Sequence, residues 1–334
     1  MIKKIVAGVL AVLVLVLAGF KLFFNKDNTP KKMMDVKENL TSYHMEANME
    51  ISSSDDKRNF FVQVDYKKDS ENDLFKISIL DKNINQEQIM LRNKEGVFVL
   101  TPALNQVYSF KGDYPLNGQK PYLYHSMLSA LEGDYNLEKV SDGYVLSFAP
   151  KYENSPNWVK EDVKLSTDFK PVWVNIYDSN NSIVCSVNFT KVDFDVKFED
   201  DDFNVEICMN KAKESAADIN RSEDDLPFKV VSNLINSELS QQTEATVDGK
   251  TVYILAYRGN QNFTIIQSII DDSEEINYSA VNGTLVNFDR GIGFYNNSYL
   301  TYIYNGIKYE VYSDTLKVSE MIDIVSSLDV IEEK

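Results

Sequence analysis

The sequence predicts a mainly β protein, in which a transmembrane helix precedes a large antiparallel sheet and a smaller α+β domain. Three patterns support this fold class. Alternating apolar and polar residues recur in short runs between residues 60 and 198, an uncharged apolar run fills residues 5–20, and a strongly polar stretch covers residues 210–225. The expected parts are a signal-anchor at 1–32, a first domain at 33–209, a linker at 210–225 and a second domain at 226–334.

Composition excludes several classes of protein. The chain has 334 residues, of which 43% are hydrophobic and 12% aromatic, so it is too apolar to be disordered. Its 34 basic and 51 acidic residues give a net charge of −17. The first 32 residues contain six Lys and a single acidic residue, so an acidic body follows a basic, apolar N-terminus. We expect no nucleic-acid partner, because binding to a polyanion needs a positive surface.

The N-terminal segment has the layout of a signal sequence. Two Lys precede the apolar run at 5–20, and Lys21 can snorkel, which extends the span to residue 24. We expect an uncleaved signal-anchor in the cytoplasmic membrane, with the body outside the cytoplasm; a cleaved secretory signal and a buried core helix are the alternatives. Residues 17–19 resemble the start of a lipobox, but Phe20 replaces the acceptor Cys, so no lipid attachment is expected.

The first domain is expected to begin with a helix at residues 32–47, where Val36, Leu40 and Tyr43 recur at helical spacing. Short alternating runs, separated by charged or Gly-containing turns, then predict an antiparallel meander that forms a large, twisted sheet. Strands are expected at residues 60–66, 75–79, 88–92, 97–101, 106–110, 144–148, 158–165, 172–177, 183–189 and 194–198.

A helix at residues 119–131 is expected to interrupt the meander. Leu123, Met127 and Leu131 recur every four residues, and Tyr124 and Leu128 lie beside them. This stripe must be buried against an apolar surface, and the nearest one is a face of the sheet. We therefore interpret the helix as a lid.

The second domain shows the strongest hairpin signal in the chain. Asn305-Gly306 favours a type I′ turn between strands at 300–304 and 307–312. A two-residue loop pairs Tyr304 with Ile307 and places alternate apolar residues of both strands on one face. The other expected elements are a helix at 226–239, strands at 251–257, 263–270 and 285–288, and a closing helix at 318–328.

The strand signatures of the first domain, taken in order, resemble the LolA-like lipoprotein-carrier superfamily. The resemblance covers residues 33–200 and is greatest to the Gram-positive spore-former branch, which includes the germination lipoprotein GerS. Three short C-terminal segments are similar to an uncharacterised module of extracytoplasmic bacterial proteins, and the combination resembles membrane-bound sporulation proteins of bacilli and clostridia. These similarities are carried by Tyr43-x-Met45-Glu46 and by residues 73–77, 97–106, 111–117, 122–131, 306–309, 318–321 and 326–328.

The resemblance implies an open antiparallel half-barrel with a helical lid over a concave apolar face. In the carriers this face holds acyl chains, and for the spore-former branch the resemblance implies docking of a cell-wall enzyme. Two features depart from these relatives. The lipobox Cys is absent, and a chain tethered by its own helix cannot carry cargo across an aqueous gap.

No residue pattern predicts a catalytic, metal or cofactor site. His44, expected in the first helix, and His125, expected on the polar side of the lid helix, are interpreted as solvated or capping residues. Cys185 and Cys208 are expected to be free thiols, with a disulfide as the alternative. The acidic run at 199–202 lacks the spacing and the Gly of a calcium loop and is interpreted as a solvated strand end.

Large apolar residues on both faces of single strands point to a second covered face. In the expected strands, Phe98 and Leu100 point opposite to Val97 and Val99, and Tyr108 and Phe110 point opposite to Val107. Either the lid or the second domain covers this face, or it forms an apolar groove for a ligand. The expected groove and lid residues are Leu123, Met127, Leu131, Tyr124, Leu128, Phe98, Leu100, Tyr108 and Phe110.

Together these features predict a membrane-anchored, extracytoplasmic protein that binds a partner and is not an enzyme. Its expected role is in sporulation or assembly of the cell envelope, where it docks a cell-wall enzyme or other envelope protein through the apolar groove. The alternative is a protein that binds lipid or lipoprotein and holds acyl chains in the half-barrel.

Overall fold

The computed structural model describes residues 28–52, 57–112, 114–115, 118–152, 155–216, 226–227, 236–270, 275–287, 292–296 and 298–327. The chain divides into two compact units, with the boundary between Asn39 and Leu40. In the first unit, the structure describes helix α2 (Thr29–Asn39). The predicted membrane anchor lies outside the described residues, and among the described residues no helix is long and apolar enough to cross a membrane.

The helix predicted at 32–47 is wrong over its second half. Helix α2 ends at Asn39, and strand β1 (Ser42–Ser52) follows. Tyr43, Met45, Ala47 and Met49 are buried and alternate with more exposed residues along this strand, a period of two rather than 3.6. Tyr43 fits both the helical and the strand pattern. The segment forms a strand because it pairs along both edges, with β2 and with β11.

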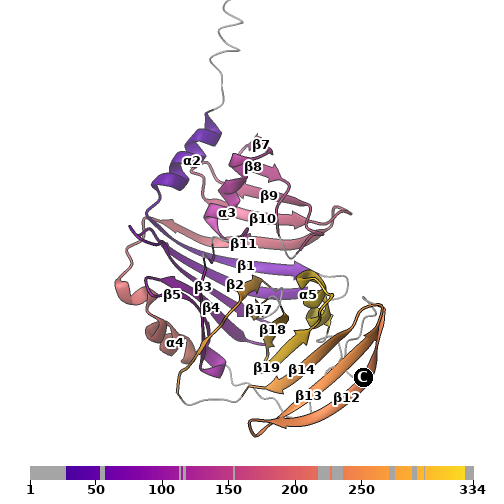
Figure 1. Ribbon diagram of the computed structural model, residues 1–334. Helices are drawn as coiled ribbons and strands as arrows, with labels where there is room; N and C mark the ends of the chain where they lie inside the picture. The colour runs from indigo at the N-terminus through magenta and orange to yellow at the C-terminus, as the bar shows by residue number, and fades with distance from the viewer. Residues whose placement is uncertain are drawn as a thin grey trace, which may run out of the picture. The chain divides into compact units, whose positions relative to one another are not determined.

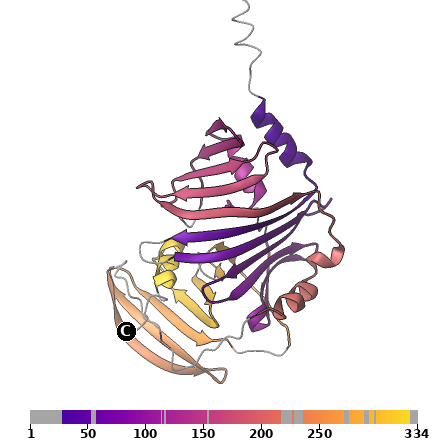
Figure 2. The ribbon, with the colours of Figure 1, turned by 180° about the vertical axis from the view of Figure 1, so that it is seen from behind.

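Twelve strands of the second unit form one sheet with the order β15-β6-β5-β4-β3-β2-β1-β11-β10-β9-β8-β7 (Figure 1). All neighbours are antiparallel except β15 and β6, and in the described part of the chain the two end strands do not pair, so this sheet is open there. The long strands β1, β2 and β11 lie side by side in its middle (Figure 2). The bounds are β1 Ser42–Ser52, β2 Lys57–Lys67, β3 Leu74–Asp81, β4 Gln86–Asn93, β5 Gly96–Thr101, β6 Gln106–Phe110, β7 Tyr135–Val140, β8 Gly143–Phe148, β9 Lys160–Leu165, β10 Pro171–Tyr177, β11 Ile183–Phe194 and β15 Asn277–Ala280.

This sheet confirms most of the predicted antiparallel strands, but β1 joins the distant strand β11, and three other strands differ from the prediction. The strands expected at 183–189 and 194–198 are one strand, β11, which ends at Phe194. Strand β7 was not predicted, because its side chains are exposed on both faces and show little apolar alternation. Strand β15 was not predicted either; it is four residues long and comes from the C-terminal half of the chain.

Seven strands form a second antiparallel sheet with the order β12-β13-β14-β19-β18-β17-β16. The predicted hairpin is confirmed, since Tyr304 pairs with Ile307, and Asn305 and Gly306 have φ angles of 48° and 76°. Helix α5 (Val318–Ser327) covers one face, where Met321 and Val325 join the buried side chains of the hairpin. The bounds are β12 Ser237–Val247, β13 Lys250–Gly259, β14 Phe263–Ile269, β16 Thr284–Asn287, β17 Ile292–Tyr295, β18 Tyr299–Tyr304 and β19 Ile307–Tyr312.

The connecting helices differ in length from the prediction. The lid is α-helical over Tyr124–Ser129 (α3) and continues as a 3₁₀ turn at Ala130–Glu132. Helix α4 (Val205–Lys213) extends into the predicted linker, because Cys208, Met209 and Ala212 are buried. The helix expected at 226–239 is wrong at its end, which belongs to β12; most of the rest lies outside the described residues.

Candidate functional site

Strand register defines two faces of the first sheet, and the predicted groove residues do not share one of them. Residues that oppose each other in a ladder point to the same side of the sheet. Phe110 opposes Val97 and Tyr108 opposes Val99, so Tyr108 and Phe110 lie opposite to Phe98 and Leu100. We call the Tyr108 side the inner face and the Phe98 side the outer face. The predicted strand residues therefore lie on two faces and do not line one groove together.

The outer face around Leu100 is covered by the segment that follows β11. Leu100 and Phe98 pack in a cluster with Phe203 of a 3₁₀ helix (Asp200–Phe203) and with Cys208 and Met209 of α4. This part of the outer face is core. Cys208 is a free thiol, as is Cys185 on β11, and both are buried.

The acidic run at 199–202 closes the start of this 3₁₀ helix. The main-chain N–H of Glu199 donates to Asp202 Oδ2 at 2.9 Å, and the two residues form a reciprocal capping box. Among the described residues, no group of three or more His, Cys, Asp and Glu side chains is arranged to hold a metal ion.

The lid segment covers the inner face over β1–β3. Leu123, Tyr124, Met127 and Leu128 are completely buried, whereas Leu131 is half-buried. The Tyr124 ring lies 6.2 Å from the ring of Tyr43. Because the side chains beside the predicted stripe are as buried as the stripe itself, the lid forms part of a filled core.

His125 was predicted to be a solvated or capping residue on the polar side of the lid, and the structure instead places it half-buried against aromatic rings. Its ring lies among the rings of Tyr43, Tyr66 and Phe75, with a centroid distance of 4.6 Å to Tyr66. His125 Nδ1 lies 3.5 Å from the Tyr43 hydroxyl. The short α3 turn places this ring on the inner face instead of in water.

The inner face also holds a buried carboxyl, which sequence reasoning missed. Glu161 of β9 is 2% exposed and accepts a hydrogen bond of 2.9 Å from the Tyr152 hydroxyl. Burial raises the pKa of Glu161 to about 8. In the sequence, Glu161 stands between Lys160 and Asp162 and reads as a solvated residue.

His44 was likewise predicted to be solvated or capping, and it is instead held between carboxylates on the outer face. Its Nδ1 lies 2.6 Å from Asp65 Oδ1 and its Nε2 lies 2.9 Å from Glu46 Oε1. Lys76 Nζ approaches the other Asp65 oxygen at 2.7 Å. The hydrogen bond to Asp65 raises the pKa of His44, more than burial lowers it.

Near β6 the inner face is covered by the second sheet and not by the lid. The Phe294 ring of β17 packs on Tyr108 and Phe110, with centroid distances of 5.3 and 4.9 Å. Strand β15 continues the first sheet beyond β6, where the Asn277 N–H donates to Asn105 O at 2.8 Å. The two halves of the second unit thus share main-chain and aromatic contacts.

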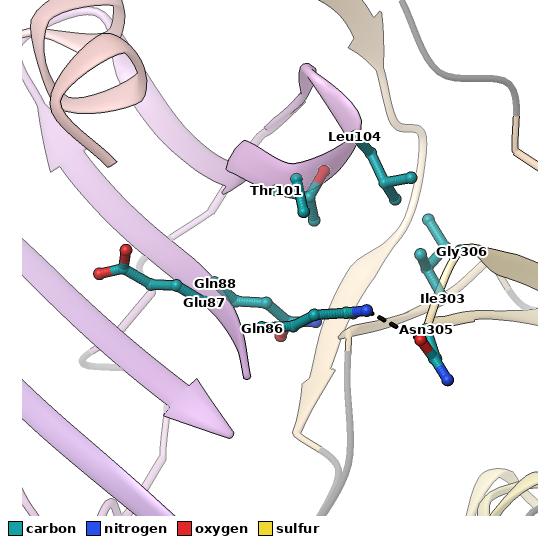
Figure 3. Close-up of a pocket in the computed structure, with 9 residues that line it drawn as sticks. Gln86, Glu87, Gln88, Thr101, Leu104, Ile303, Asn305 and Gly306 are labelled. Atoms are coloured by element: carbon teal, nitrogen blue, oxygen red, sulfur yellow. Dashed lines mark hydrogen bonds between the residues drawn. The ribbon is translucent and has the colours of Figure 1, made fainter. Parts of the chain in front are cut away.

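Polar contacts join the tip of the β18–β19 hairpin to the first sheet. Arg58 Nη1 donates to the Tyr304 hydroxyl at 2.5 Å and lies 3.4 Å from Asp81 Oδ2. Gln86 Nε2 donates to Asn305 Oδ1 at 2.8 Å, across the small pocket drawn in Figure 3. That pocket holds about 10 Å³, which is room for one water molecule, so this place is a contact and not a ligand site.

A cavity of about 890 Å³ opens beside this junction, and we call it the inter-sheet groove. Its floor is the inner face of β6 and β15, where Tyr108 pairs with Ser279. Its wall is the face of the second sheet turned away from α5. Thr301 pairs with Phe294 on one side and with Glu310 on the other, so these three side chains share that face, and all three line the groove. The lining residues are Gln106, Tyr108, Lys250, Ser268, Ile269, Ile270, Asn277, Ser279, Ala280, Val281, Asn282, Phe294, Asn296, Tyr299, Thr301, Ile303, Lys308 and Glu310.

The chemistry of the inter-sheet groove is mixed. Aromatic and aliphatic side chains alternate with amides and hydroxyls, and the Lys308 ammonium lies 3.4 Å from a Glu310 oxygen. Burial raises the pKa of Tyr108 to about 12, so its hydroxyl is neutral and can donate a hydrogen bond. Of the predicted site residues, Tyr108 alone lines this groove.

No protein-family profile matches the chain. It is 26% identical over 329 residues to the sporulation protein YdcC of Bacillus subtilis, across 97% of this chain and 95% of that protein. The expected similarity to sporulation proteins is therefore confirmed over almost the whole chain.

The solved structures that match are more distant in sequence. MucB of Pseudomonas aeruginosa, in complex with MucA, is 13% identical, with 89% of this chain and 96% of that chain covered and a TM-score of 0.35. A putative outer membrane lipoprotein-sorting protein domain from Vibrio parahaemolyticus is 14% identical, with 54% and 96% covered and a TM-score of 0.31. The structure of the CwlD amidase of Clostridioides difficile in complex with the GerS lipoprotein is 14% identical. It covers 52% of this chain and 96% of that chain, with a TM-score of 0.21.

Proposed function

We propose that this protein is an extracytoplasmic, membrane-tethered binding protein of sporulation, not an enzyme, and that it docks a protein partner in the inter-sheet groove. The similarity to a sporulation protein supports the process. The apolar N-terminal run supports the tether and the compartment. The partner is an envelope protein such as a cell-wall enzyme, as the resemblance to the spore-former branch implies.

The open groove is the single observation that carries the choice of site. Its volume of about 890 Å³ lies in the range of ligand sites, and it is lined by Tyr, Phe and Ile together with amides and hydroxyls. Protein interfaces combine aromatic anchors with polar groups in this way, whereas acyl chains favour a continuous apolar lining. A groove under the lid is not used in this proposal, because Leu123, Met127 and Leu128 are completely buried there.

The alternative, a site for acyl chains in the half-barrel, needs space on the inner face. There Met127 and Leu128 are completely buried, and the Tyr124 ring packs on Tyr43 and Phe194. Acyl chains would have to displace the whole lid. Native mass spectrometry of the purified protein tests this directly, since a bound lipid would add its mass.

A pair of Ser→Arg variants tests the proposal in the native host. Ser279 lies on the groove floor, so Ser279→Arg fills the groove with a long charged side chain. Ser147→Arg is the matched control, because Ser147 is also half-buried in a strand but lies on the outer face of β8. We expect the first variant to lower spore yield and the second to leave it unchanged, with equal protein levels. Normal sporulation in both would refute the groove.

The tether has its own test. The full-length protein is expected to fractionate with membranes, to keep its N-terminus, and to be cleaved by protease added outside the cell membrane. A mature protein that begins near Gly19 would show instead that the segment is a cleaved signal.

A further inference from the structure

We propose that the ligand of the inter-sheet groove is an extended peptide segment that adds as a new strand to the free edge of β15. This inference rests on the proposed function and names the form in which the partner is bound. The argument starts from β15, which is the end strand of the twelve-stranded sheet. Among the described residues, no strand pairs with its second edge.

The hydrogen bonds of β15 show which main-chain groups that edge presents. Asn277 N–H donates to Asn105 O at 2.8 Å and Val281 N–H donates to Ser109 O at 2.9 Å, so these two residues face β6. Main-chain groups of alternate residues in a strand point to opposite edges. Tyr278 and Ala280 therefore direct their N–H and C=O groups away from β6, as a docking edge requires.

The groove runs along this edge. Ser279 and Ala280 at the end of β15 both line it, and so do the next two residues, 281 and 282. Side chains of a strand alternate between its two faces, so the lining at the exposed residue Ala280 includes the edge of the strand. On the second sheet, Ser268 and Ile269 at the end of β14 and the following residue Ile270 line the groove. A peptide main chain fits between such borders because it can form hydrogen bonds along its whole length.

The groove also indicates the side chains of the peptide. In an added strand, every second side chain would lie on the inner face, beside Ser279 of β15 and facing the groove that Ile269 and Ile270 also line. Apolar side chains suit these positions, and polar ones suit the alternate positions. Beyond residue 32 the chain carries 28 basic and 50 acidic residues, so charge complementarity favours a segment without net negative charge.

The probe for this proposal is a display library of random peptides about ten residues long, the length of a long strand. It is selected on the full-length protein in detergent. Enriched peptides should alternate apolar and polar residues and lack net negative charge. On binding, hydrogen exchange should slow at the amides of Tyr278 and Ala280, which point to the free edge. No enrichment, or binding without this protection, would overturn the proposal.

Ala280→Pro tests the free edge of β15 by removing one main-chain N–H. Proline removes the donor on the free side and leaves the bonds to β6 intact, and edge strands tolerate it when that N–H faces outward. We expect the selected peptides to bind about tenfold more weakly or worse, while the melting temperature stays within a few degrees. Unchanged affinity in a folded Ala280→Pro protein would refute strand addition.

The two proposals can fail separately. If Ser279→Arg lowers spore yield but Ala280→Pro changes neither peptide binding nor sporulation, the groove is the docking site and the partner is not bound as a strand. If Ser279→Arg has no effect on sporulation, the proposed function itself fails. Should Ala280→Pro lower the melting temperature strongly, the hydrogen-exchange result on the wild-type protein decides.

Discussion

The inner face of the first sheet is used in two different ways at its two ends. Over β1–β3 it is filled by the lid, whose Tyr124, Met127 and Leu128 are completely buried. Over β6 and β15 it meets the second sheet at an aromatic contact around Phe294 and then opens into the inter-sheet groove. Both regions are rich in large apolar residues, yet one is core and the other a candidate binding site.

The difference lies in what stands opposite each part of the face. The lid brings further apolar side chains and the His125 ring, which fill the space as in other protein interiors. The second sheet brings Thr301, Lys308 and Glu310 on the side turned away from α5, and these residues leave an open, partly polar space. The filled region is therefore the one where apolar side chains face apolar side chains, and the open region is the one where they face polar side chains.

The largest loss of stability is expected when buried side chains of the lid are truncated. Met127→Ala and Leu128→Ala each remove a fully buried side chain and should lower the free energy of unfolding by about 2–5 kcal/mol. The two should be similar, because both residues are completely buried. Chemical denaturation of the full-length variants measures this. A loss below about 1 kcal/mol for both would show that the lid is loosely packed, contrary to its role as core.

A pH dependence of stability is the next effect, and it arises from Glu161. Its pKa is raised from 4.5 to about 8 in the folded protein, so between these values the folded state keeps a proton that the unfolded state releases. Stability should therefore fall as the pH rises through this window, by at most about 1.4 kcal/mol per pH unit.

Glu161→Gln isolates this contribution, because the amide cannot ionise and can still accept the Tyr152 hydrogen bond. Denaturation curves between pH 5 and pH 8 should be flatter for the variant than for the wild type. Parallel curves would mean that the carboxyl is hydrated in solution and does not belong to the closed core.

The outer-face network around His44 should give a smaller effect with the same sign. Its raised pKa means that the contribution to stability is complete below the unfolded value of 6.5 and is lost as the pH rises through the folded pKa. Because the side chain is partly exposed, His44→Gln should cost roughly 1 kcal/mol or less at pH 5.5. At pH 9 the variant and the wild type should have the same free energy of unfolding; a constant difference would indicate packing instead of charge.

The sequence predicted the repeating parts of the fold and missed those that depend on distant partners. The alternation of apolar and polar residues predicted most strands, and Asn305-Gly306 predicted the β18–β19 hairpin together with its register. The helix predicted at 32–47 failed because Tyr43 fits a period of four as well as a period of two, and pairing with β2 and β11 selects the strand. Strand β15 forms where the C-terminal half meets β6, which no local pattern encodes.

The candidate site was harder to predict than the fold. Apolar residues on both faces of β5 and β6 indicated two covered faces, but the identity of each cover depended on tertiary structure. Tyr108 was found because it is aromatic in a strand, whereas Ser279 and Thr301 carry no signal as single residues. Glu161 looked solvated because it stands between two charged residues, although all three lie in one strand with buried neighbours.

The smallest effect on stability is expected in the groove, and it sharpens the comparison most. Ser279 is half-buried and lines open space, so Ser279→Arg should change the free energy of unfolding by about 0.5 kcal/mol or less. Measured beside Met127→Ala, this variant separates the two ends of the inner face. A lid residue affects folding, whereas a groove residue affects only the binding of a partner. If Ser279→Arg proved as destabilising as Met127→Ala, the groove would be closed in solution and its polar lining would be part of the core.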